Sequence, residues 1–260
     1  MVDYLDVLAR DAKARVNSGY YKRVEKRFSD PPKSLRQSIL GCQNAAVIAE
    51  IKPQSPSSGE LLQERDVGEL AEGFALGGAV ALSIVTEPNH FRGSLENLSL
   101  ARRRVTVPIL MKDIVIDPIQ IEIAARMGAD CILLIQALHD RGHSTHRVET
   151  LIEEAHSRSL EALLETHTST EFSSAIKSQA DLIGINNRDL TTLKVDLRTT
   201  TTLLKNTRAE SNVIVSESGI QRPEDIRLLS KLGVRAFLVG TCLMRANSPR
   251  LKLEQLVSSL

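Results

Sequence analysis

The 260-residue sequence has no large excess of charge of either sign and few cysteines. Its 33 basic and 32 acidic residues give a formal net charge of +1. This balance favours neither nucleic acid nor an acidic membrane as a partner. Only Cys42, Cys131 and Cys242 are present, and an odd number of scattered cysteines argues against a disulfide framework. We therefore expect a cytoplasmic protein that binds any anionic ligand through a local site.

Long apolar runs, a signal peptide and low-complexity linkers are also lacking, so we expect neither a membrane span nor several domains. No glycine-rich GxGxxG sequence follows the first predicted strand, which disfavours a doubly wound dinucleotide-binding sheet. Apolar residues make up 42% of the chain and charged residues 25%, as in globular proteins. Residues 1–260 are predicted to form a single domain.

Eight short apolar runs alternate with amphipathic stretches of helical length. The runs lie at 47–51, 80–85, 109–111, 131–135, 162–164, 182–185, 213–215 and 236–239. Helical spacing between them is clearest at 117–127, 147–158 and 222–232. Nearly continuous apolar runs are typical of parallel strands covered on both faces. We therefore predict an α/β fold, a closed (β/α)8 barrel, with two further helices at 4–24 and 34–40 in an N-terminal extension of residues 1–45.

In such a barrel the chemistry lies where the strands end, and polar residues follow at least six of the predicted strands. Glu50 and Lys52 stand two residues apart and so share one face of the first strand. An exposed salt bridge is the alternative interpretation of this pair. The other polar strand ends contain Thr86 and Glu87, Lys112 and Asp113, Glu165, residues 186–188, residues 216–219, and Gly240 with Thr241.

Lys112 directly follows an apolar run, so desolvation is expected to lower its pKa and make it a better proton donor. A lysine that extends to the rim without a catalytic role is the alternative. Glu165, at the end of another strand, is a candidate for the opposite proton carrier.

Gly219 and Gly240 fall in the loops after the last two predicted strands, the usual phosphate site of this fold. They predict a phosphate cradle more strongly than they predict simple turns. His139, His143 and His146 are clustered, but no acidic or thiol ligand follows at a fixed spacing, so no metal site is predicted.

Several stretches together resemble one family, the indole-3-glycerol-phosphate synthases. They are AEIKPQSPSSG, ALSIVTEPNHFRGS, PILMKDIVIDPIQI, GADCILLI, LLETH, IGINNRDL, VSESGI and FLVGTCLMR, in this order from about Ala49 to Arg245. The resemblance implies a (β/α)8 carboxy-lyase of tryptophan biosynthesis that needs no cofactor or metal. Its substrate would be 1-(2-carboxyphenylamino)-1-deoxyribulose 5-phosphate, which loses carbon dioxide and water as the indole ring closes.

The resemblance also implies roles for individual residues. Lys112 resembles the general acid of ring closure, and Glu165 with Lys52 resembles the pair that handles dehydration. Glu50, Asn186 and Ser218 would orient the lysines and the sugar hydroxyls. Ser55 with Lys52 would meet the anthranilate carboxylate, and Arg188 would steady the charged network. The other implied substrate-binding residues are Glu217, then Phe91, Ile114, Leu133 and Leu190 around the ring, and Gly219, Gly240 and Thr241 at the phosphate.

Some positions depart from the family pattern. Pro53 and Gln54 stiffen the loop after the first strand, Thr166 stands beside Glu165, and Ile114 replaces a phenylalanine. Two alternatives stay open: a related enzyme acting on another aminated ribulose phosphate, and a phosphate-ligand sensor without turnover. The intact acid and lysine residues speak against the sensor. A monomer binding a small phosphorylated molecule is expected.

Overall fold

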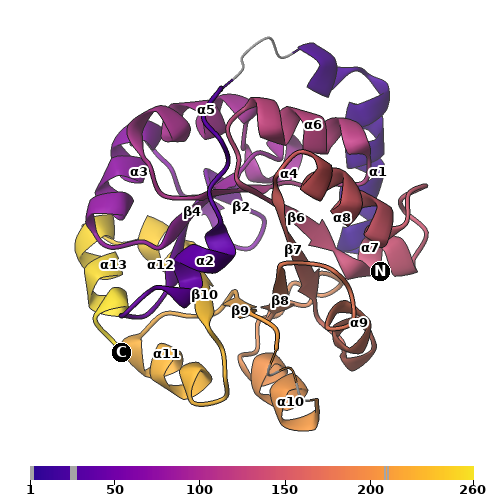
Figure 1. Ribbon diagram of the computed structural model, residues 1–260. Helices are drawn as coiled ribbons and strands as arrows, with labels where there is room; N and C mark the ends of the chain where they lie inside the picture. Colours follow the sequence, from indigo (N-terminus) through magenta and orange to yellow (C-terminus); the bar gives the residue numbers. More distant parts are fainter. Residues whose placement is uncertain (1–2, 24–27, 208, 210) are drawn as a thin grey trace.

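The computed structural model describes residues 3–23, 28–207, 209 and 211–260. Eight parallel strands close into a barrel whose order around the ring is β1-β10-β9-β8-β7-β6-β5-β4 (Figure 1). The strands are β1 (Val47–Ile51), β4 (Ala81–Val85), β5 (Ile109–Lys112), β6 (Cys131–Ile135), β7 (Glu161–Thr166), β8 (Leu182–Asn186), β9 (Ile214–Glu217) and β10 (Ala236–Val239). The predicted (β/α)8 barrel is therefore confirmed, and each predicted run lies on one of these strands.

Helices follow the strands and surround the barrel (Figure 1). The longer ones are α3 (Val67–Leu76), α5 (Leu95–Arg104), α6 (Pro118–Arg126), α8 (Val148–Ser157), α9 (Ser169–Ala175), α10 (Arg198–Asn206), α11 (Pro223–Ser230) and α13 (Pro249–Val257). Short helices α4 (Pro88–Phe91), α7 (Gln136–Asp140) and α12 (Thr241–Met244) directly follow strand ends, and β2 (Gln54–Ser55) pairs with β3 (Gly59–Glu60) after β1.

Local sequence signals fix many of these boundaries. The side chains of Asp66, Ser94, Asp117 and Thr168 accept hydrogen bonds from backbone N–H groups of the first turns of α3, α5, α6 and α9. Gly128 ends the α6 segment with a φ of +83°, a conformation that glycine adopts without steric cost.

The predicted first helix is shorter than expected. Helix α1 covers Tyr4–Asn17, and a separate 3-10 helix, η1, covers Tyr20–Arg23. Between them Gly19 has a φ of +71°, which breaks the helical path that the apolar spacing suggested. Residue 24, the predicted end, lies outside the described residues. The predicted helix at 34–40 is confirmed as α2, which covers Leu35–Leu40 and is capped by Ser34.

The N-terminal helices contact opposite ends of the barrel. Near α2, the backbone N–H of Lys33 donates to Asp130 just before β6 (2.7 Å). The N–H of Arg36 donates to Glu161 at the start of β7 (2.8 Å). Helix α1 instead reaches the carboxyl ends of β4 and β5 through Arg15. The N-terminal helices therefore hold the barrel at its amino and carboxyl ends, and α2 lies in front of the strands in Figure 1.

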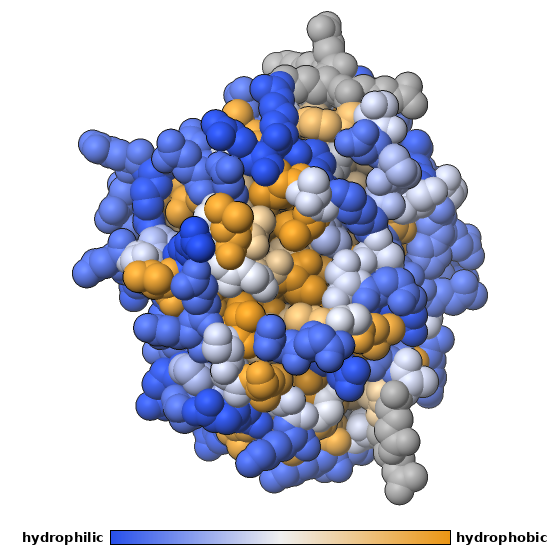
Figure 2. Space-filling model, turned by 60° about the vertical axis from the view of Figure 1, so that its left-hand side comes forward, coloured by the Kyte–Doolittle hydropathy of each residue, from blue (hydrophilic) through white to orange (hydrophobic). Residues whose placement is uncertain are grey.

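Two apolar clusters stabilise the fold. One lies between the strands and the outer helices, and the other fills the barrel and extends to Leu5 and Leu8 of α1 and to Leu35 and Ile39 of α2. On the face shown in Figure 2, apolar patches are interrupted by hydrophilic residues. In the described part of the chain, no helix has both the length and the apolar character required to span a bilayer.

Candidate active site

A cavity of about 490 Å³ opens among the carboxyl ends of the strands. This volume lies in the range typical of small-molecule sites. Every site residue predicted from the sequence lines it except Ser55. The residues come from separate strand ends, so the barrel brings together side chains that are distant in the sequence.

Lys112 is at the centre of a buried ionic cluster, which we call the Lys112 cluster: Glu50, Lys52, Lys112, Glu165, Asn186 and Glu217. Its Nζ donates to Glu165 Oε2 at 3.2 Å and to Glu217 Oε2 at 3.1 Å. The second oxygen of Glu165 accepts from Asn186 Nδ2 at 2.9 Å. Lys52, directly after β1, forms a partly buried ion pair with Glu50 of β1. The two predicted lysines and their acids therefore face one space, and an exposed salt bridge on β1 is excluded.

The expectation for the pKa of Lys112 is wrong in sign. Burial alone would lower this pKa, but the carboxylates of Glu217, Glu165 and Glu50 together raise it above its ordinary value. The acids come from other strands, so the apolar neighbours in the sequence gave no sign of them. Lys112 therefore keeps its proton until a ligand changes these contacts.

The carboxyl groups of the cluster are tuned in opposite directions. Burial raises the pKa of Glu217 to about 7 despite the opposing charge of Lys112. Burial also acts on Glu50, but Lys52 and Lys112 lower its pKa below the ordinary value. Glu217 Oε1 is buried and has no hydrogen-bond partner. One acid of the cluster is therefore held ionised, and another is poised to exchange a proton near neutral pH.

The loop after β1 carries three serines that lie in different surroundings. Ser55 is buried in β2, with its Oγ 3.2 Å from Ser57 Oγ, and it does not line the cavity. Ser58 lines the cavity instead. Arg188, at the end of β8, donates to Ser57 Oγ at 3.2 Å and to the carbonyl of Leu193 at 2.9 Å. The sequence alone does not indicate which serine of this loop lines the cavity.

Small residues line the cavity where β9 and β10 end. Ser218 and Gly219 have φ values of +66° and +87°, so the backbone turns sharply after β9. A side chain at Gly219 would approach Val195 Cγ1 to 2.7 Å, which requires glycine there. Gly240 and Thr241 come directly after β10, the strand next to β9. This region can accept an anion close to the backbone.

Apolar side chains line another part of the cavity. Phe91 of α4, Leu133 of β6, Ile114 after β5 and Leu190 after β8 were all predicted to do so. Leu8 of α1 joins them, and the sequence analysis missed it. The amphipathic pattern of the N-terminal helix predicts that Leu8 packs against the protein, but it does not predict that Leu8 lines a cavity.

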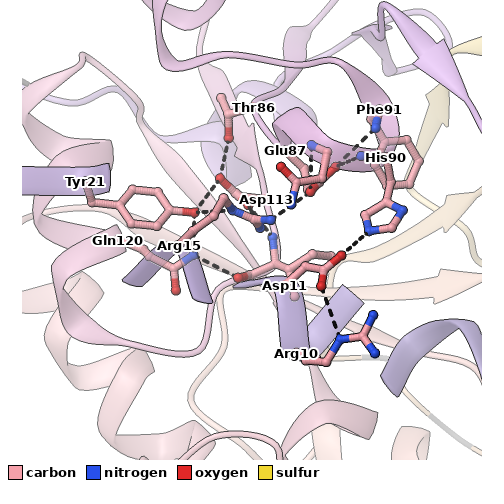
Figure 3. Close-up of polar contacts among 12 residues, drawn as sticks. Arg10, Asp11, Arg15, Tyr21, Thr86, Glu87, His90, Phe91, Asp113 and Gln120 are labelled. Carbon is pink, nitrogen blue, oxygen red and sulfur yellow. Dashed lines mark hydrogen bonds and ion pairs between the residues drawn. The ribbon is translucent and has the colours of Figure 1, made fainter. Parts of the chain in front are cut away.

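A second ionic cluster, also missed, surrounds Arg15 (Figure 3). We call it the Arg15 cluster: Arg15, Tyr21, Thr86, Glu87, Asp113 and Gln120. Arg15 donates to Glu87 Oε1 at 2.8 Å and to Asp113 Oδ1 at 3.4 Å. Asp113 Oδ2 accepts from Thr86 Oγ1 at 2.9 Å and from the Tyr21 hydroxyl at 3.2 Å. The N-terminal extension is therefore tied to the residue that follows Lys112.

Glu87 extends the Arg15 cluster to the apolar lining. Its carboxylate accepts backbone hydrogen bonds from His90 (2.7 Å) and Phe91 (3.1 Å), and so caps α4. Figure 3 shows these contacts beside the His90–Asp11 hydrogen bond. Arg15 thus supports, through Glu87, the short helix that carries Phe91.

Two of the clustered histidines contact other groups of the protein. His139 Nδ1 lies 3.1 Å from the carbonyl of His146, and His143 Nε2 lies 2.8 Å from Asp6 Oδ1. Among the described residues, no group of three or more histidine, cysteine or acidic side chains is arranged to hold a metal ion.

Comparison with known proteins decides the family. A model of the family "Indole-3-glycerol phosphate synthase" matches residues 6–256. The chain is 41% identical over 252 residues to the indole-3-glycerol phosphate synthase of Bordetella pertussis, covering 96% of this chain and 90% of the relative. The chain belongs to the indole-3-glycerol phosphate synthase family. The synthase of Koribacter versatilis is 40% identical over 257 residues, covering 97% of this chain and 96% of the relative.

Solved structures support the fold of this synthase family member. The thiamine phosphate pyrophosphorylase from Pyrococcus furiosus superposes with a TM-score of 0.62 at 18% identity, covering 87% of this chain and 97% of that one. The N-acetylmannosamine-6-phosphate 2-epimerase from Clostridium perfringens gives 0.60 at 16% identity, covering 83% and 93%. At this identity the likeness concerns the barrel alone.

Proposed function

We propose that the protein is a decarboxylating lyase that converts 1-(2-carboxyphenylamino)-1-deoxyribulose 5-phosphate into indole-3-glycerol phosphate, in tryptophan biosynthesis. The observation that carries this proposal, beside the family, is the buried Lys112 ammonium held between Glu165 and Glu217. Ring closure requires a proton donor beside a carbonyl oxygen, and a charged lysine in a water-poor cavity provides one.

In the first step, the aromatic carbon that bears the carboxylate attacks the ribulose carbonyl carbon. Lys112 donates its proton to the carbonyl oxygen, which becomes a hydroxyl group. The attack is intramolecular, so the cavity must hold the substrate folded, with the ring and the sugar close together. The apolar lining at Phe91, Ile114, Leu133 and Leu190 suits the ring.

Loss of carbon dioxide then restores the aromatic ring, and loss of the hydroxyl as water forms the indole. Dehydration needs an acid and a base on either side of the intermediate. Glu165 and Lys52 are proposed for this pair, and Glu50 holds Lys52 in place. Asn186 orients Glu165 through its 2.9 Å hydrogen bond, and Ser218 is proposed to contact the sugar hydroxyls.

The proposed site of the substrate phosphate is beside Gly219, Gly240 and Thr241, which line the cavity and are small enough to permit backbone approach. Ser55 with Lys52 is proposed to meet the anthranilate carboxylate, and Arg188 to steady the charged network. Ser58 of the same loop lines the cavity. We further propose that the chain acts as a cytoplasmic monomer, without cofactor, nucleic acid or membrane partners. Residues 1–260 would form one domain, with residues 1–45 as its extension.

The direct test is to mix the purified protein with the carboxyphenylamino substrate and follow indole fluorescence. Product formation supports the synthase, and product formed only from another aminated ribulose phosphate would support the related enzyme. Binding of substrate without product would support the sensor. Inorganic phosphate at tens of millimolar, roughly the range of weak anion binding, should compete with substrate. An unchanged initial rate at low substrate would contradict the proposed phosphate site.

A further inference from the structure

Gly184 stands in the middle of β8, where a glycine weakens a strand and contributes no packing. Its register partners are Glu165 on β7 and Val215 on β9. It is not among the residues with positive φ, so the backbone conformation does not require glycine. Gly184 also does not line the cavity, and no contact with substrate explains it.

The space above Gly184 is occupied by the side chain of Glu217. A Cβ atom at Gly184 would lie 2.3 Å from Glu217 Oε1 and 3.4 Å from Glu217 Cδ. The other nearby atom is Glu165 Cα, at 3.3 Å. A methyl group there would therefore displace the carboxylate whose other oxygen accepts from Lys112 at 3.1 Å.

Gly240 has the same relation to a second acid of the Lys112 cluster. A Cβ atom at Gly240 would lie 2.3 Å from Glu50 Oε1. Each of these carboxylates thus lies against the backbone of a glycine, Gly184 on β8 or Gly240 directly after β10. A substitution at Gly184 is easier to interpret than one at Gly240, because Gly240 also lines the cavity beside the proposed phosphate site.

We infer that Gly184 is a positioning residue. Because it has no side chain, the Glu217 carboxylate can lie against its backbone, and this carboxylate in turn fixes the position of the Lys112 ammonium. The inference rests on the proposed function and adds to it a residue that does not touch the substrate. An alanine at position 184 moves the Glu217 carboxylate away from Lys112, while the new methyl group itself lies outside the residues that line the cavity.

The first experiment compares Gly184→Ala with Gly73→Ala in steady-state kinetics. Gly73, inside α3, has open space around its Cβ position, so the same substitution meets no atom there. We expect Gly184→Ala to lower kcat at least about tenfold, within what proton-transfer groups contribute, with KM within about twofold. Its pH–rate profile should also shift, because Glu217 leaves Lys112. Gly73→Ala should leave kcat, KM and the profile unchanged.

The second experiment repeats Gly184→Ala in a Glu217→Ala background. With no carboxylate to displace, the substitution should change kcat less than about twofold, so the two effects are strongly non-additive. Equal losses in both backgrounds would overturn the inference. An unaltered kcat for Gly184→Ala in otherwise normal protein would overturn it too.

Melting temperatures cover the case in which Gly184→Ala does not fold. The double variant Gly184→Ala/Glu217→Ala should then fold and regain the melting temperature of Glu217→Ala alone. If it also fails to fold, the obstacle is the backbone at Glu165 and the inference is wrong. Absence of product with the unmodified protein would instead reject the proposed function. The melting temperatures would then still show whether a side chain at position 184 clashes with Glu217.

Discussion

Lys112 and Asp113 are neighbours in the chain, but each belongs to a different buried ionic cluster. Successive side chains at a strand end point to opposite faces, so Lys112 meets the acids inside the barrel while Asp113 meets Arg15 of the N-terminal extension. Both clusters place charges in a poorly hydrated environment, and both use residues far apart in the sequence. They differ in how completely their hydrogen bonds are satisfied.

In the Arg15 cluster, every carboxylate oxygen has a donor. Both oxygens of Asp113 accept hydrogen bonds, from Arg15 and Ile114 N–H and from Thr86 and Tyr21. Both oxygens of Glu87 accept as well. A fully satisfied buried network rigidifies the structure around it.

The Lys112 cluster is left incomplete. Glu217 Oε1 has no donor, and the side chain of Lys112 is 19% exposed, against 7% for Arg15. An unsatisfied buried polar atom costs stability, and such costs concentrate at functional sites. The comparison teaches that one cluster holds the framework and the other is open to a substrate.

The largest expected effect comes from Lys112→Ala. Turnover should fall by at least about 10²- to 10⁴-fold, since the general acid is removed. The fold should remain near that of the unmodified protein, because the Lys112 side chain is 19% exposed in the cavity, so water can reach the acids that lose their cation, unlike those around Arg15. Product formation and circular dichroism measure the two effects. Near-normal turnover with an intact spectrum would remove Lys112 from the mechanism.

Arg15→Met should act mainly on stability. It leaves Glu87 and Asp113 buried without their cation, a change that costs about 3–5 kcal/mol of unfolding free energy. Urea denaturation measures this loss, and turnover at a temperature where the variant is folded should fall less than about tenfold. Arg10→Met is the matched control, because Arg10 on the same helix is 73% exposed and its loss should be nearly neutral. A turnover loss as large as that of Lys112→Ala would erase the distinction between the clusters.

Glu217→Gln should remove a pH dependence of stability. The pKa of Glu217 is raised from 4.5 to about 7 in the folded chain, so the unfolded chain ionises more readily. The contribution of this group to stability is therefore full below pH 4.5 and is lost as the pH rises to about 7. The unfolding free energy of the unmodified protein, relative to the glutamine variant, should decline across that window in urea titrations. A difference that stays constant with pH would show that Glu217 is not protonated in the folded state.

Ile114→Phe is the smallest expected change. Ile114 lines the apolar part of the cavity, next to Asp113, and a phenyl ring there can contact the substrate ring edge to face. Such pairs are worth about 0.5–1.5 kcal/mol, or a roughly twofold to tenfold tighter binding constant. Overpacking would instead lower the melting temperature, since added volume in a full core costs about 1–3 kcal/mol. Unchanged binding and unchanged melting together would mean that Ile114 does not face the substrate.

The barrel and most of its site were predictable because each strand is a separate apolar run that ends in polar residues. Spacing alone put Glu50 and Lys52 on one face, and the structure confirms that pair. The end of the first helix was not predictable in the same way, since the apolar spacing continues past the turn at Gly19.

Long-range electrostatics accounts for the other errors. Glu217 is 105 residues from Lys112, so the sign of the lysine's pKa shift depends on the closed barrel. Arg15 is likewise 98 residues from Asp113 and looks like any cation of an amphipathic helix.

The loop after β1 is a separate case. The pairing of β2 with β3 determines which serine of this loop lines the cavity, and the local sequence does not specify that pairing.

The position of α2 at the amino end of the barrel also determines when this helix can reach its native contacts during synthesis. Arg36 bonds to Glu161, a residue made 125 positions later, and at about 5–20 residues per second this interval is roughly 6–25 s. Throughout that time Leu35 and Ile39 have no barrel to cover, so their apolar side chains are open to chaperones or to other nascent chains. Helix α2 is thus made well before β7, the strand whose Glu161 it contacts.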